Sequence, residues 1–125
     1  KVLSQNLMYK FPSEFDLLRL CNRTLEMACF NVNQIYLHFS ADCKIVIEGE
    51  YTHKKSKSDS KIVSTIPART SELMQLLQHR IVEASCVKGE TLVLGFDNGH
   101  ILEFAGGDPN FESYRIEIEG KVIVV

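Results

Sequence analysis

Several features that would point to a specialised class of protein are missing from this sequence. No apolar run approaches the ~20 residues that a membrane-spanning helix needs, and the first residues, KVLSQNLMYK, do not have the features of a signal peptide. The formal net charge is only −2, so the chain lacks the basic footprint of a nucleic-acid-binding domain. We therefore expect neither a membrane segment nor direct binding of nucleic acid.

The sequence also has no C-x-x-C motif. Its four cysteines lie at positions 21, 29, 43 and 86, with spacings that match no disulfide framework or zinc motif. A chain of 125 residues can bury a core without disulfides, so we interpret the cysteines as thiols in a reducing, cytoplasmic compartment. Cys29 and Cys86 are expected to face inward from strands as small apolar side chains.

What the sequence does contain is a strong hairpin signal between Thr91 and Gly107. Apolar residues alternate along both halves of this stretch, and Asn98-Gly99 stands between them. Asn-Gly favours a type I′ turn, in which both central residues have positive φ. The stretch therefore predicts two paired antiparallel strands, Thr91–Phe96 and His100–Ala105.

The same stretch has a partner earlier in the chain. When the sequence is displaced by 57 residues it matches itself without a gap, and seven positions between residues 13 and 49 are identical. Chance gives about one identity in fifteen to twenty positions. The identical pairs are Leu20/Leu77, Arg23/Arg80, Glu26/Glu83, Cys29/Cys86, Leu37/Leu94, Phe39/Phe96 and Gly49/Gly106. Any two helix-then-hairpin segments share some phase, but the ungapped register favours an internal duplication.

Each copy predicts a short helix followed by strands. Ser13 and Thr70 are the predicted helix N-caps. The expected strands are Val2–Phe11, Thr24–Phe30, Gln34–Ser40, Lys44–Thr52, Lys61–Pro67, Ile81–Val87, Thr91–Phe96, His100–Ala105, Phe111–Glu119 and Val122–Val125. We predict an α+β fold in which residues 1–125 form a single domain. It would contain two ungapped helix-plus-β-meander repeats, about 13–52 and 70–107, and a C-terminal hairpin, 111–125. The sheet would be largely antiparallel, or an open barrel, with the short helices on one side.

Candidate catalytic and metal-binding residues are few. The histidines at positions 38, 53, 79 and 100 do not have the spacing of a zinc site, so we interpret them as surface or half-buried residues. Cys86 with His79 or His100 would be a conceivable nucleophile pair, but Cys86 lies on the apolar phase of its strand, where a thiolate is costly. We expect no catalytic residue, no metal and no cofactor, and hence no enzyme.

The remaining polar features favour structural roles or an interaction surface. Several glutamates make the predicted strand faces acidic. The lysine-rich segment 53–61, HKKSKSDSK, is interpreted as a solvated loop. Arg23/Glu26 and Arg80/Glu83 are polar pairs that both copies share, and we expect them to bridge within a unit or between units.

A family resemblance adds a functional expectation. The run FDNGHILEFAGGDPNFESYRIEI resembles the C-terminal half of a family of small uncharacterised bacterial proteins. The family's pattern is Phe-x-Asp/Asn-Gly between two strands, here residues 96–99, followed by Tyr/Phe-Glu-Ser-Tyr/Trp, here residues 111–114. The segment from Phe15 to Glu50 is similar to the family's N-terminal half. Some members are encoded near polymorphic toxin genes, and the chain also resembles immunity proteins of contact-dependent growth inhibition systems.

The resemblance implies a cytoplasmic immunity protein that binds and neutralises a cognate toxin domain. Such proteins act through a complementary surface, often acidic against a basic partner. We expect the partner to contact Glu48, Glu50, Glu103, Glu112 and Tyr114. Two alternatives stay open. One is a structural or regulatory domain that forms homodimers through the edge strand Val122–Val125. The other is an enzyme, which would need a pocket with convergent polar groups.

Overall fold

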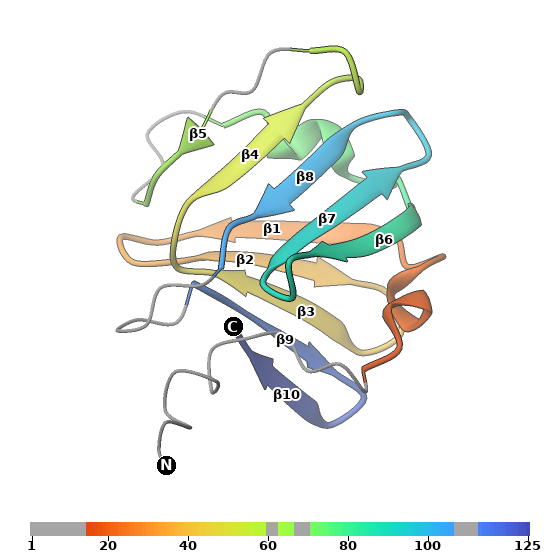
Figure 1. Cartoon of the computed structure of the whole chain (residues 1–125), viewed down its shortest axis with the longest axis vertical. Helices are drawn as coiled ribbons and strands as arrows, with labels where there is room; N and C mark the ends of the chain where they lie inside the picture. The colour runs from red at the N-terminus through yellow and green to blue at the C-terminus, as the bar shows by residue number, and fades with distance from the viewer. Residues whose placement is uncertain (1–14, 60–62, 67–70, 107–112) are drawn as a thin grey trace.

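Two antiparallel sheets face each other in the computed structural model, which describes residues 15–59, 63–66, 71–106 and 113–125 (Figure 1). Each sheet has five strands, in the orders β1-β2-β3-β9-β10 and β5-β4-β8-β7-β6. The first sheet contains β1 (Leu25–Phe30), β2 (Ile35–Phe39), β3 (Cys43–Ile47), β9 (Tyr114–Ile118) and β10 (Lys121–Val124). The second contains β4 (Tyr51–Lys54), β5 (Val63–Ser64), β6 (Ile81–Val87), β7 (Thr91–Phe96) and β8 (Ile101–Phe104). The predicted antiparallel, strand-rich architecture is confirmed.

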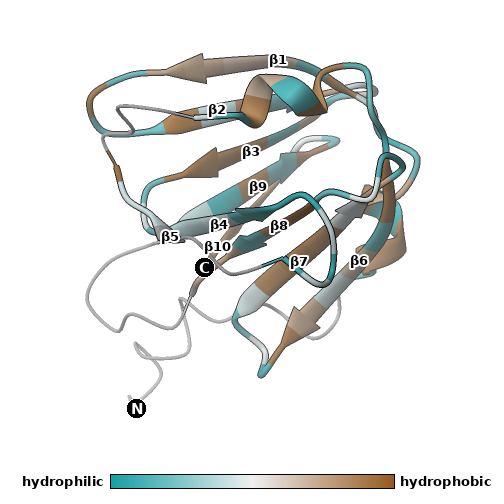
Figure 2. Cartoon of the chain, turned by 90° about the horizontal axis from the view of Figure 1, so that it is seen from above, coloured by the Kyte–Doolittle hydropathy of each residue, from teal (hydrophilic) through white to brown (hydrophobic). Residues whose placement is uncertain are grey.

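The core lies between the two sheets and takes side chains from both. Phe39 of β2 stacks on Phe96 of β7 with ring centroids 6.4 Å apart, and Phe104 of β8 meets Tyr114 of β9 at 5.8 Å. Alternate residues of β2, β3, β7 and β9 are buried, as strands with one packed face require. Each large apolar side chain buried in this way contributes roughly 1.5–3 kcal/mol. Figure 2 shows the two sheets from above.

The chain changes sheets twice, and the two crossovers lie side by side. The predicted strand Lys44–Thr52 is in fact interrupted after Ile47, so β3 stays in the first sheet while β4 joins β8 in the second. The chain crosses back between β8 and β9. The backbone N–H groups of Glu48 and Gly49 both donate to the Ser113 carbonyl oxygen, at 2.9 and 2.8 Å. As a result each sheet is built from both halves of the chain.

Gly106, in the second crossover, is packed too tightly for a side chain. A Cβ placed there would overlap the carbonyl oxygen of Glu90 and lie 2.9 Å from Val125 Cγ1. The same Glu90 carbonyl accepts a 2.7 Å hydrogen bond from the hydroxyl of Tyr114. This contact fixes the β6–β7 turn against the start of β9.

The predicted helices are single 3-10 turns. They are η1 (Leu17–Leu20) and η2 (Leu73–Leu76). Asp16, rather than the predicted Ser13, accepts the capping bond from Leu18 N–H at 3.0 Å, while Ser13 and Thr70 lie outside the described residues. No α-helix occurs among the residues that the structure describes, so the α+β expectation is wrong for this part of the chain. A segment of about two turns is too short to be stable as an α-helix without a large packed face.

A β-bulge explains why the predicted repeat register fails in one segment. Pairing of β1 with β2 shifts between Leu25 and Met27, and pairing of β6 with β7 shifts between Ile81 and Glu83. The two shifts are 56 residues apart, whereas β2 and β7 correspond at 57. A bulge moves the following side chains to the other face. Cys29 therefore pairs with Tyr36 on the outer face, and the prediction that it faces inward is wrong.

The Asn98-Gly99 turn also differs from the prediction. Only Gly99 has positive φ, at 88°, and its N–H donates to the carbonyl of Phe96 at 2.9 Å. This geometry is that of a three-residue hairpin loop whose last residue is left-handed, not of a type I′ turn. The corresponding turn in the first half does have two positive φ values, 61° at Ala41 and 58° at Asp42.

Arg23 is a buried cation that ties three segments together. Its guanidinium donates to the carbonyl oxygens of Arg19 at 2.7 Å and Ser40 at 3.2 Å, to that of Ala41, and to Glu119 Oε2 at 2.6 Å. The predicted Arg23–Glu26 bridge is therefore replaced by a bridge to Glu119. The predicted partner of Arg80 is also different, because its guanidinium contacts an Asp97 carboxylate oxygen at 3.4 Å.

Candidate functional site

The predicted contact residues do not form one surface. Glu48 lies at the end of β3, and Glu103 pairs with Thr52 on the outer face of the second sheet. Glu50 is exposed in the crossover between the sheets. Tyr114 is fully buried, with no exposed surface, so it is not available to a partner and that prediction is wrong. Glu112 lies outside the described residues.

The expected acidic face is neutralised on the first sheet. Glu48 Oε1 is 3.8 Å from the Arg115 guanidinium, which also donates to Glu117 Oε2 at 2.8 Å. Lys44 Nζ lies 3.4 Å from the other oxygen of Glu117. The hydrogen bond from Arg115 is the main reason that the pKa of Glu117 is lowered. Two cations thus balance two carboxylates, and this face does not have the charge expected of a surface for a basic partner.

The outer face of the second sheet is also balanced in charge, but it is hollowed. Two cross-strand rows of side chains define it. In one row Gly95 of β7 lies between Ile101 of β8 and Glu83 of β6, and in the next Val93 pairs with Ser85. Because Gly95 has no side chain, its row has a gap over the middle of the sheet.

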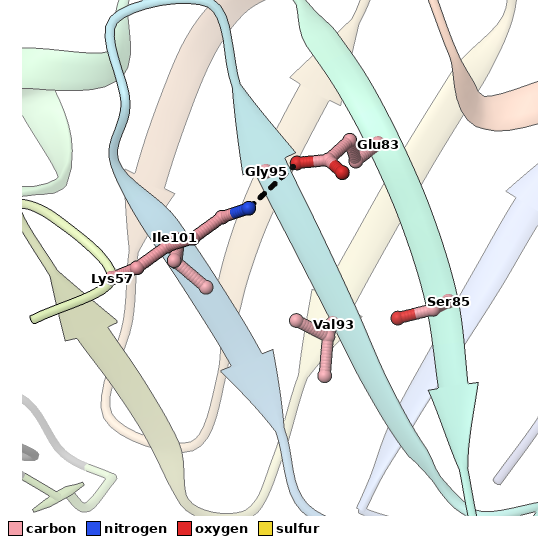
Figure 3. A pocket seen from close by; sticks show the side chains of 6 residues that line it. All are labelled: Lys57, Glu83, Ser85, Val93, Gly95 and Ile101. Atoms are coloured by element: carbon pink, nitrogen blue, oxygen red, sulfur yellow. Dashed lines mark ion pairs between the residues drawn. The ribbon is translucent and has the colours of Figure 1, made fainter.

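The gap forms a hollow of about 190 Å³ with an apolar floor and a charged rim (Figure 3). Val93 and Ile101 line it, and Ile101 is only 7% exposed. Lys57 Nζ and Glu83 Oε1 face each other at 3.8 Å across Gly95, as the dashed line in Figure 3 shows. A small-molecule pocket usually has a volume of ~300–1,000 Å³. The hollow is therefore the size of a site for a single side chain rather than for a drug-sized ligand.

The rim can open easily. The Lys57 and Glu83 side chains are 80% and 68% exposed, and a surface ion pair of this kind contributes between about 0 and 1 kcal/mol. A partner that inserts an apolar side chain would displace the pair at little cost. It would bury the apolar floor, which now contacts water.

Gly95 is the signal in the sequence that identifies this hollow. A glycine inside a strand packs no side chain and often marks a place where another backbone or a ligand approaches. The pattern Leu92–Phe96 was interpreted only as alternation of core residues, so the outer positions received no attention. Lys57 is not predictable in the same way, because it comes from a loop that is distant in sequence.

The histidines gather at the opposite end of the hairpins from the crossovers, except for His38. His53 Nε2 lies 2.9 Å from His100 Nδ1, and His79 Nδ1 lies 2.7 Å from Asp97 Oδ1. Burial lowers the pKa of His53 and of His100. Among the residues described, no group of three or more potential ligands could hold a metal ion.

The four cysteines are free thiols. Burial raises the pKa of Cys43 to about 11 and also raises the pKa of Cys86. A thiol with a raised pKa is a poor nucleophile at neutral pH, which argues against the Cys86 nucleophile that the sequence left open.

The fold and the hollow define the chain as an antiparallel, two-sheet protein with a shallow binding surface. The chain belongs to a protein family of unknown function, DUF6188, which matches residues 17–125. Neither the curated proteins nor the solved structures that were compared include a match. No helix in the described ranges is long and apolar enough to cross a membrane.

Proposed function

We propose that this chain is a protein-binding module that neutralises a cognate bacterial toxin domain by binding to it in the cytoplasm. The resemblance to immunity proteins supports this function, and the observation that carries it is the hollow over Gly95. The hollow combines an apolar floor, a volume that suits one side chain and a rim that opens readily. Binding energy in protein interfaces is concentrated where an anchor side chain enters such a pocket.

The occupant we propose is an apolar or aromatic side chain of the toxin domain. The surrounding face has Lys54 and Lys57 opposite Glu83 and Glu103, so its charges are mixed. An interface with mixed charges selects a partner through complementary pairs around the anchor. The acidic contacts that the sequence predicts, Glu48 and Glu50, would then be peripheral.

Filling the hollow tests this function. Gly95→Val places a branched side chain over the floor, and its Cβ would lie 3.2 Å from Glu83 Oε1, the far end of an exposed and flexible side chain. β-Branched residues suit strands, so the variant should fold. His38→Val is the matched control, because His38 occupies the corresponding position in the first sheet.

The experiment captures partners of the tagged protein from lysate of its source and then co-expresses the captured protein with each variant. We expect a stoichiometric partner that is toxic alone. The wild type and His38→Val should relieve its toxicity, and Gly95→Val should not. A partner that is not toxic would contradict the neutralising function. Relief by Gly95→Val would contradict the site.

One further observation favours a second candidate, a structural or regulatory domain that self-associates. β10 is an edge strand of the first sheet, and Val122 on it is 60% exposed. Edge strands with exposed apolar residues pair readily with other chains. A dimer in light scattering that Val122→Lys converts to a monomer would support this candidate, whereas a monomeric wild type would remove it.

We also propose that the two halves arose by duplication. The two sheets have the same order when each strand of the first half is matched to one of the second, β1 to β6 and so on to β5 and β10. The bulges in β1 and β6 correspond. So do the left-handed residues Asn22 and Gln78, which have φ of 67° and 71°. This correspondence supports repeats with a one-residue insertion rather than ungapped repeats.

A further inference from the structure

A pair of imidazoles links the second sheet to the loop that contributes to the hollow. His53 lies in β4, and His100 immediately precedes β8. Their nitrogens Nε2 and Nδ1 are 2.9 Å apart and their ring centroids 5.0 Å apart. A hydrogen bond between two imidazoles needs one N–H donor and one unprotonated acceptor. When both rings are protonated, neither can accept and the two charges repel.

Several charged groups from neighbouring segments face this pair. They are Lys55 at the end of β4, Asp59 in the following loop, Glu72 before η2 and His79 before β6. Lys55 Nζ lies 3.1 Å from a Glu72 carboxylate oxygen, but both side chains are more than half exposed. Such an exposed pair is a weak tether, so the half-buried imidazole pair is the better-shielded polar contact here.

The segment that follows His53 is a small, internally bonded loop, residues 55–59. The Lys55 N–H donates to Asp59 Oδ2 at 3.0 Å, and the Ser56 hydroxyl donates to Asp59 Oδ1 at 3.2 Å. The Lys55 carbonyl oxygen lies 4.0 Å from where a Cβ on Gly99 would be. The loop therefore packs against the tip of the β7–β8 hairpin, and it carries Lys57 to the rim of the hollow.

We propose that the His53–His100 pair is an acid-sensitive latch that holds loop 55–59 on the β7–β8 hairpin. Protonation of both rings breaks the bond between them and adds positive charge beside Lys55. The loop then separates from the hairpin, and Lys57 leaves the rim. The latch does not depend on what the hollow binds, so it goes beyond the proposed function.

The direction of the pH dependence follows from the two pKa values. Burial lowers both below the ordinary value near 6.5, and for each ring a neighbouring positive charge acts in the same direction. The open loop, with its imidazoles in water, therefore binds more protons than the closed loop. Closure is complete above pH 6.5 and is progressively lost as the pH falls below it.

Amide hydrogen exchange of residues 55–59 at pH 7.5 and pH 5.0, corrected for intrinsic rates, tests the latch. In the wild type we expect protection of these amides to fall by about fivefold at pH 5.0, the effect of losing one ordinary hydrogen bond on a local opening equilibrium. His53→Gln and His100→Gln should each remove the pH dependence. His38→Gln, on the other sheet, should keep it.

Two results would overturn the latch. One is protection of residues 55–59 in the wild type that does not change with pH. The other is a pH dependence that persists in both glutamine variants. Because a variant can also lose stability, the ring signals of the wild type are titrated by NMR in parallel. Titration of His53 and His100 at or above about 6.5 would equally exclude the mechanism.

Discussion

Replacing Arg23 with methionine should destabilise the protein far more than the same change at Arg19. Both guanidinium groups contact Glu119, at 2.6 and 2.7 Å. They differ in burial, because the Arg23 side chain is 9% exposed and that of Arg19 is 31% exposed. Only Arg23 also donates to the carbonyl oxygens of Arg19, Ser40 and Ala41.

The magnitude follows from those partners. Each buried acceptor that loses its donor costs about 1–3 kcal/mol, and water reaches the Ser40–Ala41 turn and reduces that cost. The bridge to Glu119 is half exposed and adds little. We therefore expect Arg23→Met to lower the free energy of unfolding by about 3 kcal/mol. Arg19→Met should lower it by less than ~1 kcal/mol, since methionine keeps most of the apolar stem.

Urea unfolding followed by far-ultraviolet circular dichroism at pH 7 measures both variants. The comparison is valid if the slope with denaturant concentration is unchanged. Losses that are equal for the two variants, or a loss below about 1 kcal/mol for Arg23→Met, would show that the buried hydrogen-bond network does not have the role assigned to it here.

Two further predictions concern the core at the second crossover. Gly106→Ala should lower the free energy of unfolding by about 1–3 kcal/mol, because its Cβ would overlap the Glu90 carbonyl; thermal melting measures the loss, and a melting temperature equal to that of the wild type would contradict the close packing. Tyr114→Phe removes the 2.7 Å bond to the same carbonyl and should cost about 1–2 kcal/mol in urea unfolding, whereas a neutral effect would mean that water replaces the hydroxyl.

Much of the fold could be predicted from the sequence because strand alternation is a local signal. The pairs β2–β3 and β7–β8 followed directly from their apolar residues and turns. The change of sheet after Ile47 could not be predicted, because β3 and the start of β4 are both buried and together resemble one long strand. The bulges were also missed, since an extra unpaired residue in β1 leaves no distinct residue type.

The candidate site was less predictable than the fold. Glutamates on strands suggested an acidic surface, but their cation partners, such as Arg115 for Glu48, come from strands distant in sequence. Tyr114 belongs to a motif that looked exposed, and its burial depends on β9 joining the first sheet. The hollow required knowledge of which residues flank Gly95 across three strands.

The most direct test of the proposed binding surface is site-specific photo-crosslinking in cells of the source. A photoreactive amino acid replaces Ser85 at the exposed rim of the hollow or, as the control, Lys44 on the outer face of the first sheet. The proposed function predicts one discrete protein adduct from position 85 and none from position 44. No adduct from position 85, or the same adduct from both positions, would contradict it.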